Sequence, residues 1–365
     1  MQDLLYKIAL TKIPKVGAIT AKNLISYMGG AEAVFRASKK QLLKIPGIGN
    51  HIAKEVLNQN VLKDAEQEVE FIEQHDIRPI FYLDKDYPQR LKHYNDCPLL
   101  LFYKGISDLN HDRIIGIVGT RKPSQYGISM TEEIVKRLAP YQPIILSGLA
   151  YGVDITAHQK SLEMGLETIG ILGHGLSRIY PPQHRKIALE MMEKGAVMTE
   201  FASHTPPDPQ NFPMRNRIVA GLSDALIVVE TAEKGGSMIT ARMAKSYHRP
   251  VFAVPGRVKD KMAKGCNELI KDGRAKLLES ANDIAEFLKW DAGNEEIKDR
   301  QAKLFVTLTD EEKSILDLLQ DAEEAGIDKL TFETKINHSK MASLLLDMEF
   351  KGLIRMIPGK RYILV

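Results

Sequence analysis

Two short segments of the chain combine glycine, hydroxyl and arginine residues beside apolar runs. GIVGTRKPSQYG (116–127) ends an apolar run with a glycine turn and an arginine, and EKGGSMITARMA (233–244) puts a glycine turn before a helical pattern. The residues that could bind a ligand are Gly119, Thr120 and Arg121 in the first segment and Gly235, Gly236, Ser237 and Thr240 in the second. Glycine lets backbone N–H groups approach a ligand, a helix N-terminus favours an anion, and a guanidinium binds phosphate through paired hydrogen bonds. Both segments therefore predict phosphate binding.

The phosphate could belong to a dinucleotide, a mononucleotide or a nucleic acid. The segment around Gly119 lacks the full GxGxxG spacing, and no acidic residue ends the next apolar run, PIILSG (143–148). These two departures argue against a dinucleotide.

A third segment, NFPMRNRIVAG (211–221), places an aromatic ring close to two cations. Its candidate residues are Phe212, Arg215, Asn216 and Arg217. Arginines near an aromatic side chain are typical of surfaces that follow a nucleic-acid backbone and stack its bases. We expect one of the arginines to pair instead with Glu200 or Glu230, which follow neighbouring apolar runs.

The segment SGLAYGVDITAH (147–158) places Ser147 and Gly148 at the end of another apolar run, where backbone amides could form an anion nest. Asp154 and His158 follow four residues apart, so they share one face of a helix. They could act together to fix the loop, or Asp154 could cap the helix while His158 is a buried polar group. No third partner for acid–base catalysis is identifiable, and we expect both residues to give structural support.

The elements that position these segments follow from the hydrophobic pattern. Between residues 113 and 279, short β-branched apolar runs alternate with amphipathic segments. Apolar runs of this length are typical of strands buried on both faces of a parallel sheet. The fold class is therefore predicted as α/β, with a Rossmann-like doubly wound sheet. Ligands bind such sheets outside the carboxyl ends of the strands, where the candidate segments lie.

The two ends of the chain show different patterns. KIPKVGAITAKNLI (12–25) and KIPGIGNHIAKEVL (44–57) form a weak repeat that resembles the helix–hairpin–helix motif, which binds nucleic-acid backbones. The alternative is a helical domain whose turns only connect helices. Residues 305–365 predict three helices and a hairpin turning at Pro358–Gly359, the pattern of a winged helix. Because this block is net acidic, we expect it to bind a partner or to bind DNA weakly.

Composition sets the remaining limits. The 365 residues are 44% hydrophobic and 27% charged, and the two cysteines, Cys97 and Cys266, are far apart. These values predict a soluble, cytoplasmic protein without a disulfide framework, metal site, signal peptide or membrane span. Net charge is +3 overall, but it is +6 in residues 1–60 and +7 in residues 113–280. The predicted domains are a helical (SAM-like) domain at 1–75, the α/β domain at 76–290, a linker at 291–304 and a winged helix at 305–365.

Taken together, the motifs resemble the DNA-processing protein A family (DprA, also called Smf). The resemblance rests on VGTR, SGLAYGVDITAH, GILGHGLSRIYPPQH, FPMRNRIVAGLSDALIVVE, GGSMITARMA and VFAVPG…GCNELIKDGRAKLL, in order across residues 114–278. The chain departs from the family pattern at Gly235, where serine is usual, and at Arg274, which stands inside the usual Gly–Ala pair. The resemblance implies a non-enzymatic protein of DNA recombination and competence that binds single-stranded DNA. Such proteins dimerise, protect incoming DNA during natural transformation and load the RecA recombinase, without a cofactor.

The resemblance also implies roles for individual residues. The DNA-binding set contains the glycine, hydroxyl, aromatic and arginine residues named above, together with Arg185. The implied dimer interface comprises Asn267, Leu269, Ile270, Leu277 and Leu278.

Two other functions remain open from the sequence. GGSMIT is similar to the PGGxGT turn of phosphoribohydrolases that act on nucleoside monophosphates. Lys234 replaces the proline of that turn, however, and no glutamate follows Thr240 by two or three residues. The other alternative is an adaptor that uses only its two end domains.

Overall fold

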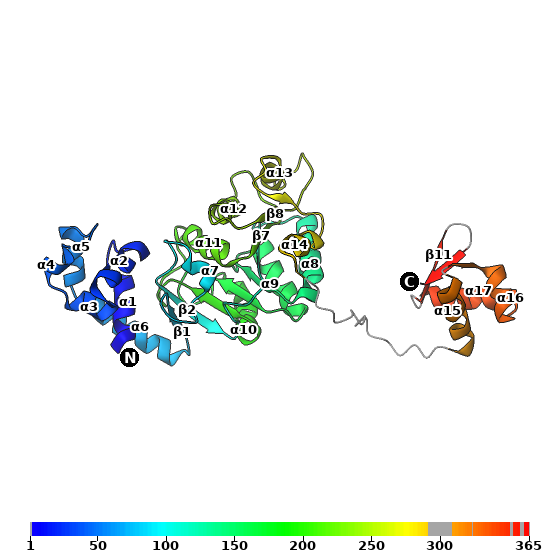
Figure 1. Ribbon diagram of the computed structural model, residues 1–365, viewed down its shortest axis with the longest axis horizontal. Helices are drawn as coiled ribbons and strands as arrows, with labels where there is room; N and C mark the ends of the chain where they lie inside the picture. The colour runs from blue at the N-terminus through cyan, green and yellow to red at the C-terminus, as the bar shows by residue number, and fades with distance from the viewer. Residues whose placement is uncertain (1, 291–308, 323, 351–352, 358–360, 365) are drawn as a thin grey trace. The chain divides into compact units, whose positions relative to one another are not determined.

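The structure is a computed structural model that describes residues 2–290, 309–322, 324–350, 353–357 and 361–364. The chain divides into two compact units after Gly293 (Figure 1). The first unit holds the N-terminal helices and the α/β domain, and the second holds the C-terminal domain. None of the helices in the described ranges has the length and apolar character needed to cross a membrane.

Six helices form the N-terminal domain. They are α1 (Gln2–Lys12), α2 (Ala18–Met28), α3 (Ala31–Arg36), α4 (Lys39–Leu42), α5 (Asn50–Leu57) and α6 (Val61–Gln74). Buried apolar side chains such as Ile8, Leu24 and Leu42 hold the helices together. The buried carboxylate of Glu68 on α6 accepts hydrogen bonds from the backbone N–H (2.8 Å) and hydroxyl (2.6 Å) of Ser203, which ties this domain to the α/β domain.

A nine-stranded sheet forms the centre of the first unit, in the order β1-β2-β6-β5-β4-β3-β7-β8-β9. The strands are β1 (Arg78–Phe81), β2 (Leu100–Gly105), β3 (Ile114–Val118), β4 (Ile144–Ser147), β5 (Thr168–Ile171), β6 (Ala196–Thr199), β7 (Ala225–Val228), β8 (Val251–Ala253) and β9 (Lys276–Leu277). Strands β3 to β9 pair in parallel, whereas β2 pairs antiparallel with β1 and β6. The predicted mostly parallel sheet is confirmed.

Helices cover both faces of the sheet. They are α7 (Gln89–Lys92), α8 (Gln125–Leu138), α9 (Val153–Glu163), α10 (Arg185–Lys194), α11 (Asn211–Leu222), α12 (Gly236–Ser246), α13 (Lys264–Lys271) and α14 (Asn282–Leu288), with 3₁₀ turns at Ala139–Tyr141 and Pro182–His184. Alternate residues of β3 enter opposite cores: Ile114 packs with α11, α12 and α13, and Ile115 packs with α8, α9 and α14. This alternation explains why the strands read as continuous apolar runs.

Strand order reverses at β3, and this reversal positions the site. From β3 the chain adds β4, β5 and β6 on one side, then returns to place β7, β8 and β9 on the other. The loops after β3 and β7 therefore separate in opposite directions and leave a crevice at the carboxyl ends of the strands.

The second unit is a winged helix. It contains α15 (Asp310–Ala322), β10 (Ala325–Gly326), α16 (Ile327–Thr334), α17 (His338–Phe350), β11 (Ile354–Ile357) and β12 (Arg361–Leu364). Thr309 caps α15, because its hydroxyl accepts a hydrogen bond from the N–H of Glu312 (3.3 Å) and its own N–H donates to the Glu312 carboxylate (2.9 Å). The expected hairpin turn at 358–359 and the expected linker at 291–304 lie outside the described residues.

Candidate nucleic-acid interface

A cleft of about 520 Å³ opens at the carboxyl ends of the central strands. Its walls come from the loop after β3, the start of α11 and the turn that leads into α12. Ten of the residues predicted to bind DNA line it: Gly119, Thr120, Arg121, Phe212, Arg215, Asn216, Gly235, Gly236, Ser237 and Thr240. The fold therefore brings together three segments, at residues 119–121, 212–216 and 235–240, that are separate in the sequence.

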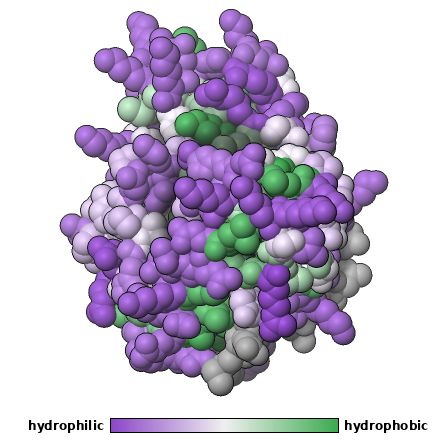
Figure 2. Space-filling model, turned by 90° about the vertical axis from the view of Figure 1, so that its left-hand side faces the viewer, coloured by the Kyte–Doolittle hydropathy of each residue, from purple (hydrophilic) through white to green (hydrophobic). Residues whose placement is uncertain are grey.

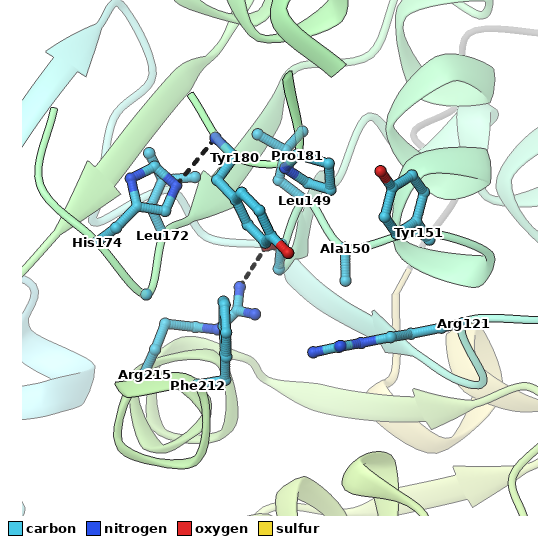
Figure 3. A pocket seen from close by; sticks show the side chains of 12 residues that line it. Arg121, Leu149, Ala150, Tyr151, Leu172, His174, Tyr180, Pro181, Phe212 and Arg215 are labelled. Carbon is cyan, nitrogen blue, oxygen red and sulfur yellow. Dashed lines mark hydrogen bonds between the residues drawn. The ribbon is translucent and has the colours of Figure 1, made fainter. Parts of the chain in front are cut away.

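Arg121 is the exposed cation of the cleft. Its guanidinium carbon lies 5.4 Å from the centre of the Phe212 ring, and no carboxylate among the described residues pairs with it. Figure 3 shows Arg121 reaching from the loop after β3 toward Phe212 and Arg215 on α11. A guanidinium held against an aromatic face keeps its hydrogen-bond donors free for an anion.

Close backbone packing holds the Arg121 loop in place. The carbonyl of Thr120 accepts a hydrogen bond from the N–H of Val153 (3.2 Å), at the start of α9. Gly152 adopts φ +80°, and a Cβ there would overlap the Thr120 carbonyl and the Arg121 backbone. Glycine at 152 is therefore required by both its conformation and its neighbours.

An inner hollow lined by aromatic and apolar side chains adjoins the cleft. Tyr180 and Tyr151 line it and are 42% and 41% exposed, and the Tyr180 ring lies 6.2 Å from the Phe212 ring. The N–H of Tyr180 donates to Nε2 of His174 (3.3 Å), which fixes the loop that carries it (Figure 3). Neither tyrosine was predicted to contact DNA, although Tyr151 lies in SGLAYGVDITAH and Tyr180 in GILGHGLSRIYPPQH, because their spacing carries no periodic signal.

Arg215 lines the cleft but is buried against the ends of two strands. Only 3% of the residue is exposed, and its Nη1 donates to the backbone carbonyls of Gly148 and Ile171, at the ends of β4 and β5. Burial lowers its pKa to about 10, although the Asp154 carboxylate favours the charged form. Because the protein backbone uses the donors at Nη1, the predicted phosphate contact of Arg215 falls to its other nitrogen atoms and stays a prediction. Its charge still contributes to the potential inside the cleft.

Asp154 and His158 do not bond to each other. The Asp154 carboxylate accepts a hydrogen bond from the N–H of Ala150 (3.4 Å), and Nδ1 of His158 lies 2.6 Å from the hydroxyl of Thr168 on β5. Burial raises the pKa of Asp154 and lowers that of His158 to about 3. The pairing along the helix face is not formed: Asp154 instead bonds to the backbone of Ala150, and His158 to the side chain of Thr168.

The turn before α12 is tightly packed. A Cβ at Gly235 would overlap the hydroxyl of Thr231, so this chain's glycine fits where the family usually has serine. Ser237 and Thr240 line the cleft, but they are only 6% and 1% exposed. The turn therefore offers mainly backbone to a ligand.

Comparison with known proteins identifies the family. The family model for DNA recombination-mediator protein A matches residues 78–289, more than half of the chain. The chain belongs to this family, also known as DprA or Smf. Models for a SAM-like helix–hairpin–helix tandem and for the DprA winged helix match residues 7–59 and 303–360. The predicted fold and family are confirmed.

Individual DprA relatives cover most of the chain. Protein Smf of Synechocystis is 31% identical over 98% of both chains, and DprA of Bacillus subtilis is 42% identical over 56% of this chain and 69% of its own. The crystal structure of Streptococcus pneumoniae DprA is 30% identical and superposes with a TM-score of 0.64 over 77% of this chain and 97% of its own. A Helicobacter pylori DprA structure, described as showing a unique single-stranded DNA binding mode, is 30% identical with a TM-score of 0.53, covering 58% and 95%.

Four of the residues predicted to contact DNA do not line the cleft. The hydroxyl of Ser147 is fully buried and donates to the carbonyl of Ile117 (2.5 Å). Arg217 pairs with Glu200 at 2.5 Å, as expected for one of the two arginines, and the pair is largely buried. Arg185, at the start of α10, is exposed but does not line the cleft. Gly148 lines the inner hollow, where a Cβ would overlap the Arg215 guanidinium.

The predicted dimer residues separate into core and surface. Leu269 and Leu278 are 1% and 0% exposed and pack in opposite cores of the α/β domain, so they cannot contact a partner. Asn267 closes a local turn through hydrogen bonds with both backbone groups of Gly256. Ile270 is half-buried, and Leu277 on the edge strand β9 is 42% exposed.

Proposed function

We propose that this chain binds single-stranded DNA in the cleft with little sequence preference, protects incoming DNA during natural transformation and loads RecA recombinase onto it. The observation that carries the proposal is the exposed, unpaired guanidinium of Arg121 lying against the Phe212 ring beside two glycine turns. The Helicobacter pylori relative, whose structure concerns single-stranded DNA binding, supports the same ligand class.

The side chains around the cleft favour a single strand over a duplex. The rings of Phe212, Tyr180 and Tyr151 line the cleft and its inner hollow, and an aromatic face contributes about 1–3 kcal/mol when it stacks on an unpaired base. In a duplex the bases are already stacked on each other. Stacking and phosphate contacts are largely independent of base identity, which gives binding without sequence readout.

Binding is favoured over hydrolysis of a nucleoside monophosphate. Asp154 is the only acidic residue among the described residues that line the cleft, and its carboxyl is buried and bonded to backbone. A general acid or base needs to reach its substrate within hydrogen-bond distance. We therefore propose a non-enzymatic role that needs no cofactor.

A homodimer is part of the proposal, with the exposed side of β9 as its contact. Leu277 and Ile270 supply apolar surface there, and β9 is the last strand of its edge of the sheet. A symmetric pair would extend the binding surface across two clefts. Leu277→Glu is expected to shift the light-scattering mass from dimer to monomer without lowering the thermal midpoint, and a dimer that persists would remove this edge from the interface.

The proposed place of action is the cytoplasm. Both cysteines are free and buried, so neither forms a disulfide that would require an oxidising compartment.

The test of the proposed function combines three measurements on the full chain. Labelled oligo-dT is titrated at two salt concentrations, release of ribose phosphate from AMP is followed, and RecA assembly on single-stranded DNA is timed with and without the protein. Tight, salt-dependent oligo-dT binding, no AMP hydrolysis and faster RecA assembly are expected. Phe212→Leu keeps the apolar volume at the start of α11 but removes the ring, and it should weaken oligo-dT binding. AMP turnover would overturn the proposal, and so would equal affinity of the Phe212→Leu variant.

A further inference from the structure

A second cavity, of about 690 Å³, opens at the carboxyl ends of β7 and β8. The start of α8, the residue Glu230 and the loop that follows β8 form its walls. In the described part of the chain it shares no lining residue with the cleft or with the inner hollow, so it is a separate site. Its volume is in the range of cavities that enclose a small molecule.

Glu230 presents a fixed carboxylate to this cavity. The residue is 6% exposed, and its backbone has φ of 51°, in the left-handed region that a glutamate rarely adopts. Its carbonyl accepts a hydrogen bond from the N–H of Thr120 (2.7 Å), and its carboxylate accepts from the N–H (2.8 Å) and the hydroxyl (2.5 Å) of Ser124. Ser124 uses one lone pair of each carboxylate oxygen, so each oxygen has another for a further donor. The carboxylate is therefore held in one orientation and can still accept a hydrogen bond from a ligand.

Tyr126 supplies an aromatic ring to the same cavity. Its hydroxyl donates to the Pro255 carbonyl (3.0 Å), which fixes the side chain, and the residue is 47% exposed. Apolar groups of Val254, Pro255 and Ala263 also line the cavity. The surface on the side of the N-terminal helices, shown in Figure 2, is in contrast mainly hydrophilic, with its apolar residues in small separate patches. The cavity therefore suits a ligand with a flat, apolar part that can stack on the ring.

The loop after β8 adds positive charge. Arg257 lines the cavity, is exposed and has no carboxylate partner among the described residues. Residues 256–264 also contain Lys259, Lys261 and Lys264, against one acidic residue, Asp260. A guanidinium binds phosphate through paired hydrogen bonds, and surrounding cations raise the local concentration of an anion. The ligand is therefore expected to carry phosphate as well as a flat ring.

From these observations we infer that the cavity binds a free nucleotide whose base carries an amino group. The base stacks on Tyr126, its amino group donates to the Glu230 carboxylate, and its phosphate binds Arg257. Adenine, guanine and cytosine carry such an amino group, whereas uracil and thymine present a carbonyl oxygen that cannot donate to a carboxylate. The inference is independent of the ligand of the cleft, and oligo-dT, whose bases have no amino group, does not compete for the cavity.

The first test measures binding of AMP, CMP and UMP to the full chain by isothermal titration calorimetry. CMP and UMP are a matched pair, because their bases differ only in the amino group and the ring nitrogen beside it. CMP should bind roughly tenfold more tightly than UMP, since it makes one more hydrogen bond to a charged group. Glu230→Gln replaces one carboxylate oxygen with an amide that donates, and should make CMP and UMP bind alike. Equal affinity of the parent chain for CMP and UMP, or no binding of any of the three, would overturn the inference.

Variants of the phosphate and ring contacts provide the second test. Arg257→Gln should weaken AMP binding by roughly tenfold and leave adenosine binding unchanged, because only the phosphate loses its partner. Lys259→Gln is the matched control, because Lys259 is exposed in the same loop but does not line the cavity. Tyr126→Phe keeps the ring and should retain AMP binding, whereas Tyr126→Leu should weaken it.

A cleft variant shows which site the nucleotide occupies. Arg121→Ala removes the exposed cation of the cleft and should bind AMP like the parent chain. Thermal melting of each variant checks that the fold is unchanged. Equal effects of Arg257→Gln and Lys259→Gln, equal AMP binding by the two Tyr126 variants, or loss of AMP binding in Arg121→Ala would each refute the proposed site.

Discussion

Replacement of Arg121 by alanine is the most direct test of the cleft. The side chain is exposed, it has no carboxylate partner among the described residues, and its one assigned contact is with the Phe212 ring. Removing it should therefore leave the fold intact, because no buried group loses a partner. Any loss of binding can then be assigned to the missing guanidinium.

The size of the effect follows from the kind of contact. A hydrogen bond to a charged group contributes about 1.5–3 kcal/mol, so loss of one phosphate contact should weaken binding about ten- to a hundredfold. The slope of log affinity against log salt should also become shallower by about 0.7, which is the contribution of one phosphate contact on a single strand. Arg121→Lys retains the charge but loses the planar pair of donors, and should therefore keep the slope and lose only part of the affinity.

The assay is fluorescence anisotropy with labelled oligo-dT at four salt concentrations. Lys122→Ala is the matched control, because Lys122 is exposed in the same loop but does not line the cleft. Thermal melting of each variant checks that the fold is unchanged. If Arg121→Ala and Lys122→Ala show the same affinity and the same slope as the parent chain, Arg121 does not contact the strand and the cleft assignment fails.

Three further predictions concern the support of the cleft. Gly148→Ala pushes a methyl group into the Arg215 guanidinium and should cost about 1–3 kcal/mol of unfolding free energy, measured by urea denaturation, together with weaker oligo-dT binding. Arg217→Ala leaves the Glu200 carboxylate buried without its partner and should lower the free energy of unfolding by about 3 kcal/mol at pH 8. The loss should be smaller at acidic pH, where the carboxylate is protonated, and the folded fraction should bind oligo-dT normally. Burial depresses the pKa of His158 to about 3, so below about pH 6.5 the unfolded chain binds a proton that the folded chain does not. The free energy of unfolding should therefore fall as the pH decreases below about 6.5, and it should fall less steeply in His158→Gln. Equal pH profiles of the two proteins would contradict this assignment.

The sequence by itself determined the elements and the class of the fold. Each of the apolar runs between residues 113 and 279 became a strand, since a parallel sheet covered on both faces needs continuous apolar segments. Once the strands are parallel, residues that follow them must gather at one edge of the sheet. This is why Arg121, Phe212 and Gly236, which come from separate segments of the sequence, line the same cleft.

The tertiary structure decided how each polar side chain is used. Arg215 and Arg217 are two residues apart on one helix, yet Arg215 bonds to backbone carbonyls beside the cleft and Arg217 pairs with Glu200. Positions two apart on a helix point about 200° away from each other, and the partner of each is set by which strand end it meets. Local spacing does not contain that information.

Burial was likewise decided only in three dimensions. Ser147 and Leu269 both belong to motifs that suggested contact with a ligand or a partner, but both are buried in the α/β domain. Conversely, Tyr180 and Tyr151 gave no periodic signal and became exposed rings beside the cleft. Exposure depends on which elements pack over a residue, and that is fixed by contacts between segments distant in the sequence. The lysines of the N-terminal repeat show the same dependence on tertiary packing. Lys22, in the first copy, donates a hydrogen bond to the Cys97 carbonyl of the α/β domain, whereas Lys54, at the same position of the second copy, is exposed.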